Sequence, residues 1–165
     1  MAGVAAADNQ DDEATLRALA AALADQVEAV LPGWVERSVE RRVLAHAGAV
    51  PDATRAAAVD AGRRAAVEVG AAMRALLATD VDEQRTNPLA VLRSAVSYPT
   101  EVLAAAGVPP VPRSPFEARA FPDDVYDLSP ATWSDIDASL QEPGIVWGAA
   151  KAHVVLTRRR REGKR

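Results

Sequence analysis

Apolar residues recur every three or four positions through the first half of the chain, a spacing that places them on one face of an α-helix. We therefore predict a helix over about residues 13–31. Asp11 or Asp12 can cap its start, and Pro32-Gly33 is expected to end it. The apolar face of this predicted helix consists of Leu16, Leu19, Leu23, Val27 and Val30.

Two further helices are predicted before residue 80. The first covers about residues 34–47, carries an apolar stripe of Val35, Val39 and Val43, and stops at Gly48. The second covers about residues 52–78 and has small residues on one face, which would let a neighbouring backbone approach closely. The alternative is that alanine and glycine are simply frequent in this part of the chain. The small residues are Gly62, Ala66 and Gly70.

The second half of the chain has a different composition. Residues 86–156 hold nine of the eleven prolines and six of the seven aromatic residues. Asn87 is a good N-cap and Pro88 a good first residue for a fourth helix, which Pro99 is expected to interrupt. A short helix over about residues 100–106 then ends at Gly107. Two later helices are predicted over about residues 130–140 and 145–159.

The connection from Val108 to Leu128 is long for a compact domain and contains four closely spaced prolines, which favour extended backbone. We predict no regular structure in it. Its three aromatic residues could bury area at low entropic cost. We therefore expect the loop to wrap over the helices, anchored by Phe116, Phe121 and Tyr126.

These patterns predict an all-α, single-domain helical bundle with a long proline-rich loop packed across it. We expect residues 1–12 to be disordered, residues 13–157 to form the helical domain, and residues 158–165 to form a basic tail. The chain has no cysteine. We expect no signal peptide, because residues 1–12 lack a basic region followed by an apolar core, and no apolar run is long enough to span a bilayer. We therefore expect a soluble cytoplasmic protein.

Charge is distributed unevenly along the chain. Residues 151–165 carry seven Lys or Arg and one Glu, whereas residues 1–150 carry twelve basic and twenty-two acidic residues. Cations at a helix C-terminus complement the helix dipole, but one or two would suffice. The basic cluster therefore suggests a weak contact with an anionic partner, such as RNA, an acidic protein surface or anionic lipid. Its core is Arg158, Arg159, Arg160 and Arg161.

Few residues of the chain suggest a catalytic or metal-binding site. His46 and His153 lie far apart and do not form a metal-binding spacing. The acidic group of Asp123, Asp124 and Asp127 could bind Mg²⁺ or Ca²⁺, but turn formation explains it better. Lys151 interrupts the most apolar predicted helix, so we expect it to reach solvent or to pair with an acidic side chain in 123–127. A catalytic lysine is the less favoured alternative. We expect no metal site and no cofactor.

Four runs carry a resemblance: Asn87-Pro88-Leu89, Val108-Pro109-Pro110-Val111, residues 121–128 (FPDDVYDL) and residues 147–152 (WGAAKA). Over about residues 86–157 the chain resembles a group of small actinobacterial proteins that has no assigned activity. The resemblance therefore implies no catalytic residue.

Two classes of function remain. The first, which we favour, is a non-enzymatic interaction or regulatory protein, with a protein partner or self-association through the loop or the basic tail. The second is a small-molecule-binding protein or enzyme with a site under the 108–128 loop. The polar and aromatic residues of that second site would be Tyr98, Asp124, Asp127, Trp133, Trp147 and Lys151.

Overall fold

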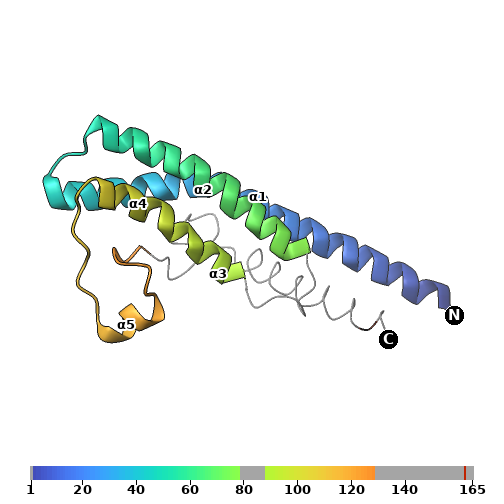
Figure 1. Cartoon of the computed structure of the whole chain (residues 1–165). Coiled ribbons are helices and arrows are strands. Elements are labelled where there is room, and N and C mark those ends of the chain that lie inside the picture. Colours follow the sequence, from blue (N-terminus) through green and yellow to red (C-terminus); the bar gives the residue numbers. More distant parts are fainter. Residues whose placement is uncertain (1, 79–87, 129–161, 163–165) are drawn as a thin grey trace.

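The computed structural model describes residues 2–78, 88–128 and 162, and these residues form helices and loops without a strand. The all-α prediction is therefore confirmed. Figure 1 shows two long helices packed side by side, with a second, shorter helical layer against them. The elements are α1 (Ala2–Ala47), α2 (Asp52–Ala78), α3 (Pro88–Arg93), the 3₁₀ turn η2 (Ser94–Val96), α4 (Ser97–Ala105) and α5 (Pro115–Ala120).

Helix α1 continues through Pro32, so the prediction that Pro32-Gly33 ends a helix is wrong. A proline inside a helix costs about 3 kcal/mol because it removes one hydrogen bond and crowds the preceding turn. Leu31 and Val35 on either side are fully buried, and each such burial contributes about 1.5–3 kcal/mol. Packing of the continuous apolar face therefore outweighs the local penalty. The helix also begins at Ala2, so the backbone of residues 2–12 is helical where we expected disorder.

The turn between the two long helices matches the prediction. Gly48 adopts a left-handed φ of 74°, which is a glycine conformation, and its N–H donates to the Leu44 carbonyl at 2.9 Å. Helix α2 then runs over Asp52–Ala78, as predicted. The predicted linker over residues 79–85 lies outside the described residues.

Gly62 brings α1 and α2 into close contact, which favours the first of the two interpretations of the small residues of α2. A Cβ placed on Gly62 would lie 2.9 Å from Pro32 Cα and 3.0 Å from the Pro32 carbonyl oxygen. The two backbones therefore touch at this level. Further along, Arg74 Nη2 of α2 lies 2.8 Å from Asp25 Oδ1 and 2.5 Å from Glu28 Oε2 of α1. This arginine joins the helices at the exposed edge of their interface.

The second layer is helical from Pro88 to Ala105. The prediction that Pro99 interrupts this helix is therefore wrong. The α-helix instead tightens into η2 before the proline. Pro99 then lies in the first turn of α4, directly after η2, and its side chain is buried. The predicted start at Pro88 is confirmed.

The end of α4 at Gly107 is also confirmed. Gly107 has a φ of 73°. Its N–H donates to the Ala104 carbonyl at 3.1 Å, and the next N–H, of Val108, donates to the Leu103 carbonyl at 3.0 Å. This pair of bonds is a Schellman cap. It turns the chain out of α4 and into the 108–128 loop.

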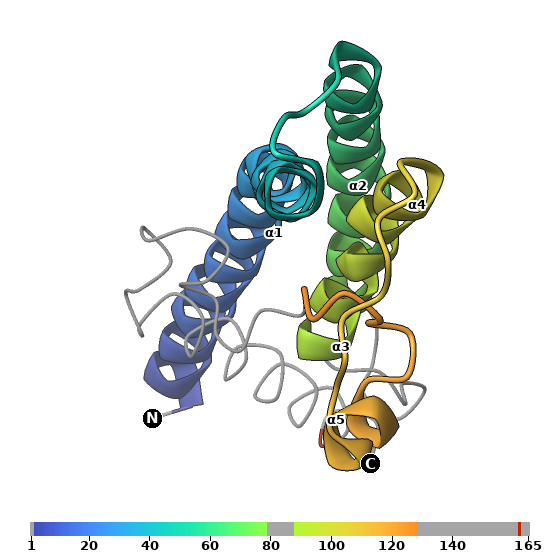
Figure 2. The same ribbon diagram turned by 90° about the vertical axis from the view of Figure 1, so that its left-hand side faces the viewer.

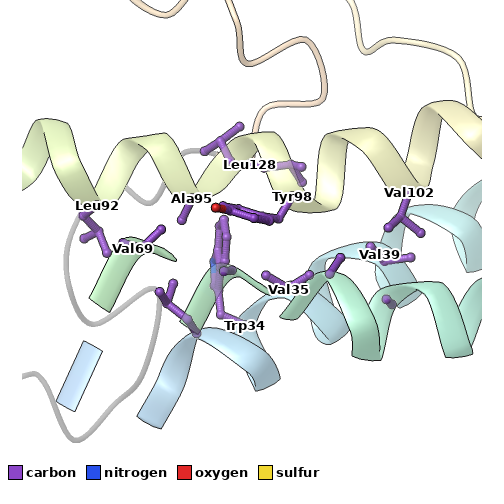
Figure 3. Packing of buried hydrophobic residues seen from close by; sticks show 14 of the residues in the cluster. Trp34, Val35, Val39, Val69, Leu92, Ala95, Tyr98, Val102 and Leu128 are labelled. Carbon is purple, nitrogen blue, oxygen red and sulfur yellow. The ribbon is translucent and has the colours of Figure 1, made fainter. Parts of the chain in front are cut away.

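A single buried cluster unites these elements. Helix α4 packs against both α1 and α2, and Figure 2, which views the molecule along the long helices, shows it beside α2. Figure 3 shows Trp34 and Val35 of α1, Tyr98 of α4 and Leu128 of the loop within this cluster. Among the described residues, no helix is long and apolar enough to cross a membrane.

Candidate functional site

The segment 108–128 leaves the bundle and returns to it, and its two ends are joined to each other. Val108 and Tyr126 are both buried, with Tyr126 only 2% exposed. The Tyr126 hydroxyl donates to the Val108 carbonyl at 2.8 Å. One step farther out, the Val111 N–H donates to the Val125 carbonyl at 2.9 Å. The loop is therefore closed at its base, and the predicted anchoring by Tyr126 is confirmed.

Asp124 fixes the returning arm of the loop. Its side chain is 4% exposed, and its two carboxylate oxygens accept from the Leu128 N–H at 2.8 and 3.0 Å. Asp127 adopts a left-handed φ of 55° in the same turn, and its carbonyl accepts a long bond of 3.4 Å from Arg42 Nη2 of α1. These contacts support the interpretation of the aspartates as turn residues. In the described ranges, no three potential metal ligands of the His, Cys, Asp or Glu type gather into a site.

Arg113 connects the two arms of the loop. Its Nη1 donates to the Phe121 carbonyl at 2.8 Å and also to the Asp124 carbonyl. Both acceptors belong to the returning arm, while Arg113 belongs to the outgoing arm. We did not single out this residue from the sequence, because a lone arginine in a proline-rich segment gives no signal of its partner.

The tip of the loop is the short helix α5, which contradicts our prediction that residues 108–128 lack regular structure. Its start is fixed by a capping box. The Glu117 N–H donates to Ser114 Oγ at 3.2 Å, and the Ser114 N–H donates to Glu117 Oε2 at 3.0 Å. The bond from the Ser114 backbone lowers the pKa of Glu117. Pro115 provides a favourable first helical residue.

The aromatic side chains of the loop have different environments. Phe116 on α5 is 80% exposed, so the expectation that it packs on the helices is wrong. It belongs to the first turn of a helix whose six residues are all exposed, so within the described ranges α5 contributes no buried side chain beside the ring. Phe121 is half-buried, with the Arg93 guanidinium of α3 4.8 Å from the ring centroid. Figure 1 shows α5 standing away from the long helices.

We predicted Tyr98 as part of an alternative site under the loop, but its hydroxyl group contacts α2. Its side chain is 8% exposed, and its hydroxyl donates to Glu68 Oε2 at 2.5 Å. Burial and this hydrogen bond raise the pKa of Tyr98 to about 12. The Arg64 guanidinium lies 5.7 Å from the ring centroid and 3.1 Å from Glu101 Oε2. These contacts form a polar seam between α2 and α4.

The remaining site predictions fall outside the described residues. This applies to the aromatic and lysine candidates of the alternative site and to the arginines of the basic tail: Trp133, Trp147, Lys151, Arg158, Arg159, Arg160 and Arg161. The contact predicted between Lys151 and the acidic side chains of 123–127 stays a prediction. Comparison of the chain with protein-family models, curated proteins and solved structures finds no match.

Proposed function

We propose that this chain is a non-enzymatic interaction protein that docks a protein partner through the tip of the 108–128 loop. The observation that supports this proposal is the exposed ring of Phe116 on a helix held in place by its own capping box. A large aromatic ring surrounded by water is an unused source of binding free energy. Exposed apolar side chains of this kind, when presented on a fixed scaffold, are typical interface anchors.

The energetics favour binding over simple exposure. Transfer of a phenylalanine side chain from water to an apolar pocket contributes about 1.5–3 kcal/mol. The bond at the base of the loop and the capping box of α5 order the closed loop before docking, which lowers the entropic cost of binding by this closed state. Arg119 lies one helical turn after Phe116 and is also exposed. The partner we propose therefore offers an apolar pocket for the ring with a carboxylate at its rim.

The alternative, a small-molecule or enzymatic site under the loop, has less support. Tyr98 and Tyr126 donate their hydroxyl groups to Glu68 and to the Val108 carbonyl, and Asp124 accepts from the Leu128 N–H. In the described part of the chain, each of these groups takes part in a hydrogen bond within the fold. The proposal retains a cytoplasmic setting and includes a second copy of the chain among the protein partners to be tested.

The decisive experiment compares three full-length baits: the natural chain, Phe116→Ala and Val67→Ala. Val67 is a matched control because it is an apolar side chain, 66% exposed, on the surface of α2. Baits are incubated with lysate of the organism that encodes the chain, and sedimentation of each purified protein measures self-association. We expect a partner, or a second copy, that binds the natural chain and Val67→Ala but not Phe116→Ala. Identical behaviour of all three baits would refute the proposal.

A fourth bait separates the loop from the basic tail. It lacks residues 158–165 and retains Phe116. A partner that this bait still captures depends on the loop, whereas a partner that it fails to capture depends on the tail. Circular dichroism of each bait checks that all have the same helix content, which we expect because Phe116 contributes little buried area.

A further inference from the structure

The tip of the loop is attached to the molecule mainly by polar bonds. Across residues 109–123 every side chain is exposed or half-buried, whereas the flanking residues Val108 and Asp124 are buried. Segments with little buried apolar area open more readily than the core of a domain. The tip's one contact with the helices in the described residues is the half-buried ring of Phe121 against the Arg93 guanidinium. The bonds between the two arms therefore contribute strongly to keeping the tip closed.

Arg113 provides two of these bonds from a single nitrogen, to the carbonyls of Phe121 and Asp124. The backbone bond from Val111 to Val125 also crosses between the arms, nearer the base. The capping box of α5, in contrast, joins Ser114 to Glu117 within the tip itself and does not tie one arm to the other. The guanidinium is therefore the outermost link between the arms in the described residues.

We infer that the loop tip is a separately opening unit and that Arg113 is its latch, with hinges next to Val108 and Asp124. When the latch is open, α5 no longer keeps a fixed orientation relative to the bundle. When it is closed, Phe116 is presented from a fixed position. This device belongs to the fold itself and does not depend on the proposed binding function, because opening is measurable on the isolated chain.

The reporter of opening is the Val111 N–H, whose bond to the Val125 carbonyl crosses between the arms at 2.9 Å. Its hydrogen exchange is measured by NMR in the natural chain, in Arg113→Ala and in Arg119→Ala. Arg119 is the matched control, because it is an exposed arginine of the same loop. Amides of Ala65 and Val69 in the buried face of α2 report on the bundle.

We expect Arg113→Ala to accelerate exchange at Val111 by about tenfold or more, because hydrogen bonds from a charged donor are among the stronger ones in proteins. Exchange in α2 should stay unchanged, and Arg119→Ala should match the natural chain. Unchanged exchange at Val111 in Arg113→Ala would overturn the inference. Equal acceleration at Val111 and in α2 would also overturn it, since Arg113 would then stabilise the whole fold and not a separate unit.

Discussion

Replacement of Gly62 by alanine would place a methyl group where the backbones of α1 and α2 meet. The added Cβ would lie 2.9 Å from Pro32 Cα, 3.0 Å from the Pro32 carbonyl oxygen and 3.4 Å from its carbonyl carbon. These atoms belong to the helix backbone and cannot rotate away as a side chain can. The two helices would therefore have to separate, which would disturb the packing of buried neighbours such as Leu31 and Val35.

Two opposing terms set the size of the effect. Overpacking in a well-packed core costs about 1–3 kcal/mol, while alanine stabilises the interior of a helix by about 0.8–1.0 kcal/mol relative to glycine. We expect a net loss of about 0–2 kcal/mol for Gly62→Ala. The gain in helix propensity from glycine to alanine would partly hide the cost of overpacking if Gly62→Ala were measured alone. A second glycine-to-alanine variant in the same helix is therefore needed as a control.

Gly70 provides that control. A Cβ at this position would meet Glu28 Oε2 at 3.1 Å, and Arg74 Nη1 and Glu28 Cβ at 3.4 Å. Most of these contacts are with the movable ends of long side chains, which can shift at little cost. Gly70→Ala should therefore keep most of the gain from helix propensity. Because that gain is shared, the difference between the two variants isolates the backbone contact and should be about 1–3 kcal/mol.

The measurement is urea unfolding followed by far-ultraviolet circular dichroism, with the free energy of unfolding taken from variants whose m-values agree. The natural chain, Gly62→Ala, Gly70→Ala and the double variant are compared. Gly62→Ala should be the least stable of the single variants. If it proves as stable as Gly70→Ala, the close approach of Pro32 to Gly62 does not limit the packing of the two helices, and the reasoning fails.

Three further outcomes are expected. The pKa of Tyr98 is raised from 10.0 to about 12, so the stability that the protonated Tyr98 hydroxyl gives to the fold is complete below pH 10 and is lost as the pH rises through 12. The thermal unfolding temperature should therefore fall over this pH range in the natural chain and not in Tyr98→Phe. The same pH profile in both proteins would contradict the raised pKa of Tyr98. Phe121→Ala should lower the free energy of unfolding by less than the roughly 3–5 kcal/mol expected for a fully buried ring. A double-mutant cycle with Arg93→Ala should give a coupling energy of about 0.5–1 kcal/mol. A coupling energy of zero would exclude the contact between the Arg93 guanidinium and the Phe121 ring. Deletion of residues 158–165 should weaken binding to anionic vesicles or duplex nucleic acid. For the full-length chain and a duplex, the logarithm of the binding constant should fall with the logarithm of salt concentration with a slope near −0.9 for each phosphate that the tail neutralises. Equal binding by the full-length and the shortened chain would mean that the tail is only a solvated chain end.

The helix boundaries that could be predicted are those set by local backbone chemistry. Gly48 and Gly107 both adopt the left-handed conformation that a helix end requires, and Pro88 starts a helix because its missing N–H has no cost there. The close approach at Gly62 agrees with one of the two interpretations of the small residues on one face of α2, the other being that alanine and glycine are simply frequent there. In these cases a local signal and the tertiary structure favour the same conformation.

Pro32 and Pro99 show where the same reasoning fails. At Pro32 the local signal predicts an end to the helix, but burial of the residues on both sides keeps α1 continuous. At Pro99 the helical backbone also continues, through the 3₁₀ turn η2 into α4. A proline alone therefore does not locate a helix end. Its effect depends on burial, which a single sequence does not reveal.

The loop was predicted less well, although part of the signal was present. Ser114 and Glu117 have the capping-box spacing, with Pro115 between them, and this pattern was sufficient to predict α5. The prolines around it favoured an extended segment instead. The burial of Tyr126 and the exposure of Phe116 could not be distinguished, because both are aromatic residues in one proline-rich stretch. Their environments depend on how the chain returns to Val108.

The return of the 108–128 loop to Val108 has a consequence for how the sequence of this protein can evolve. The Tyr126 hydroxyl bonds to the Val108 carbonyl, so in the described residues the helical bundle meets the loop at its base and at the contact of Phe121 with Arg93. Residues 114–120 at the tip are all exposed and form a cassette whose length and sequence can vary while the bundle keeps its packing, since each doubling of loop length adds only about 0.6 kcal/mol of closure entropy. A chain built in this way can acquire a new helix at the loop tip by local substitution or insertion, and the stability of the scaffold need not be selected anew.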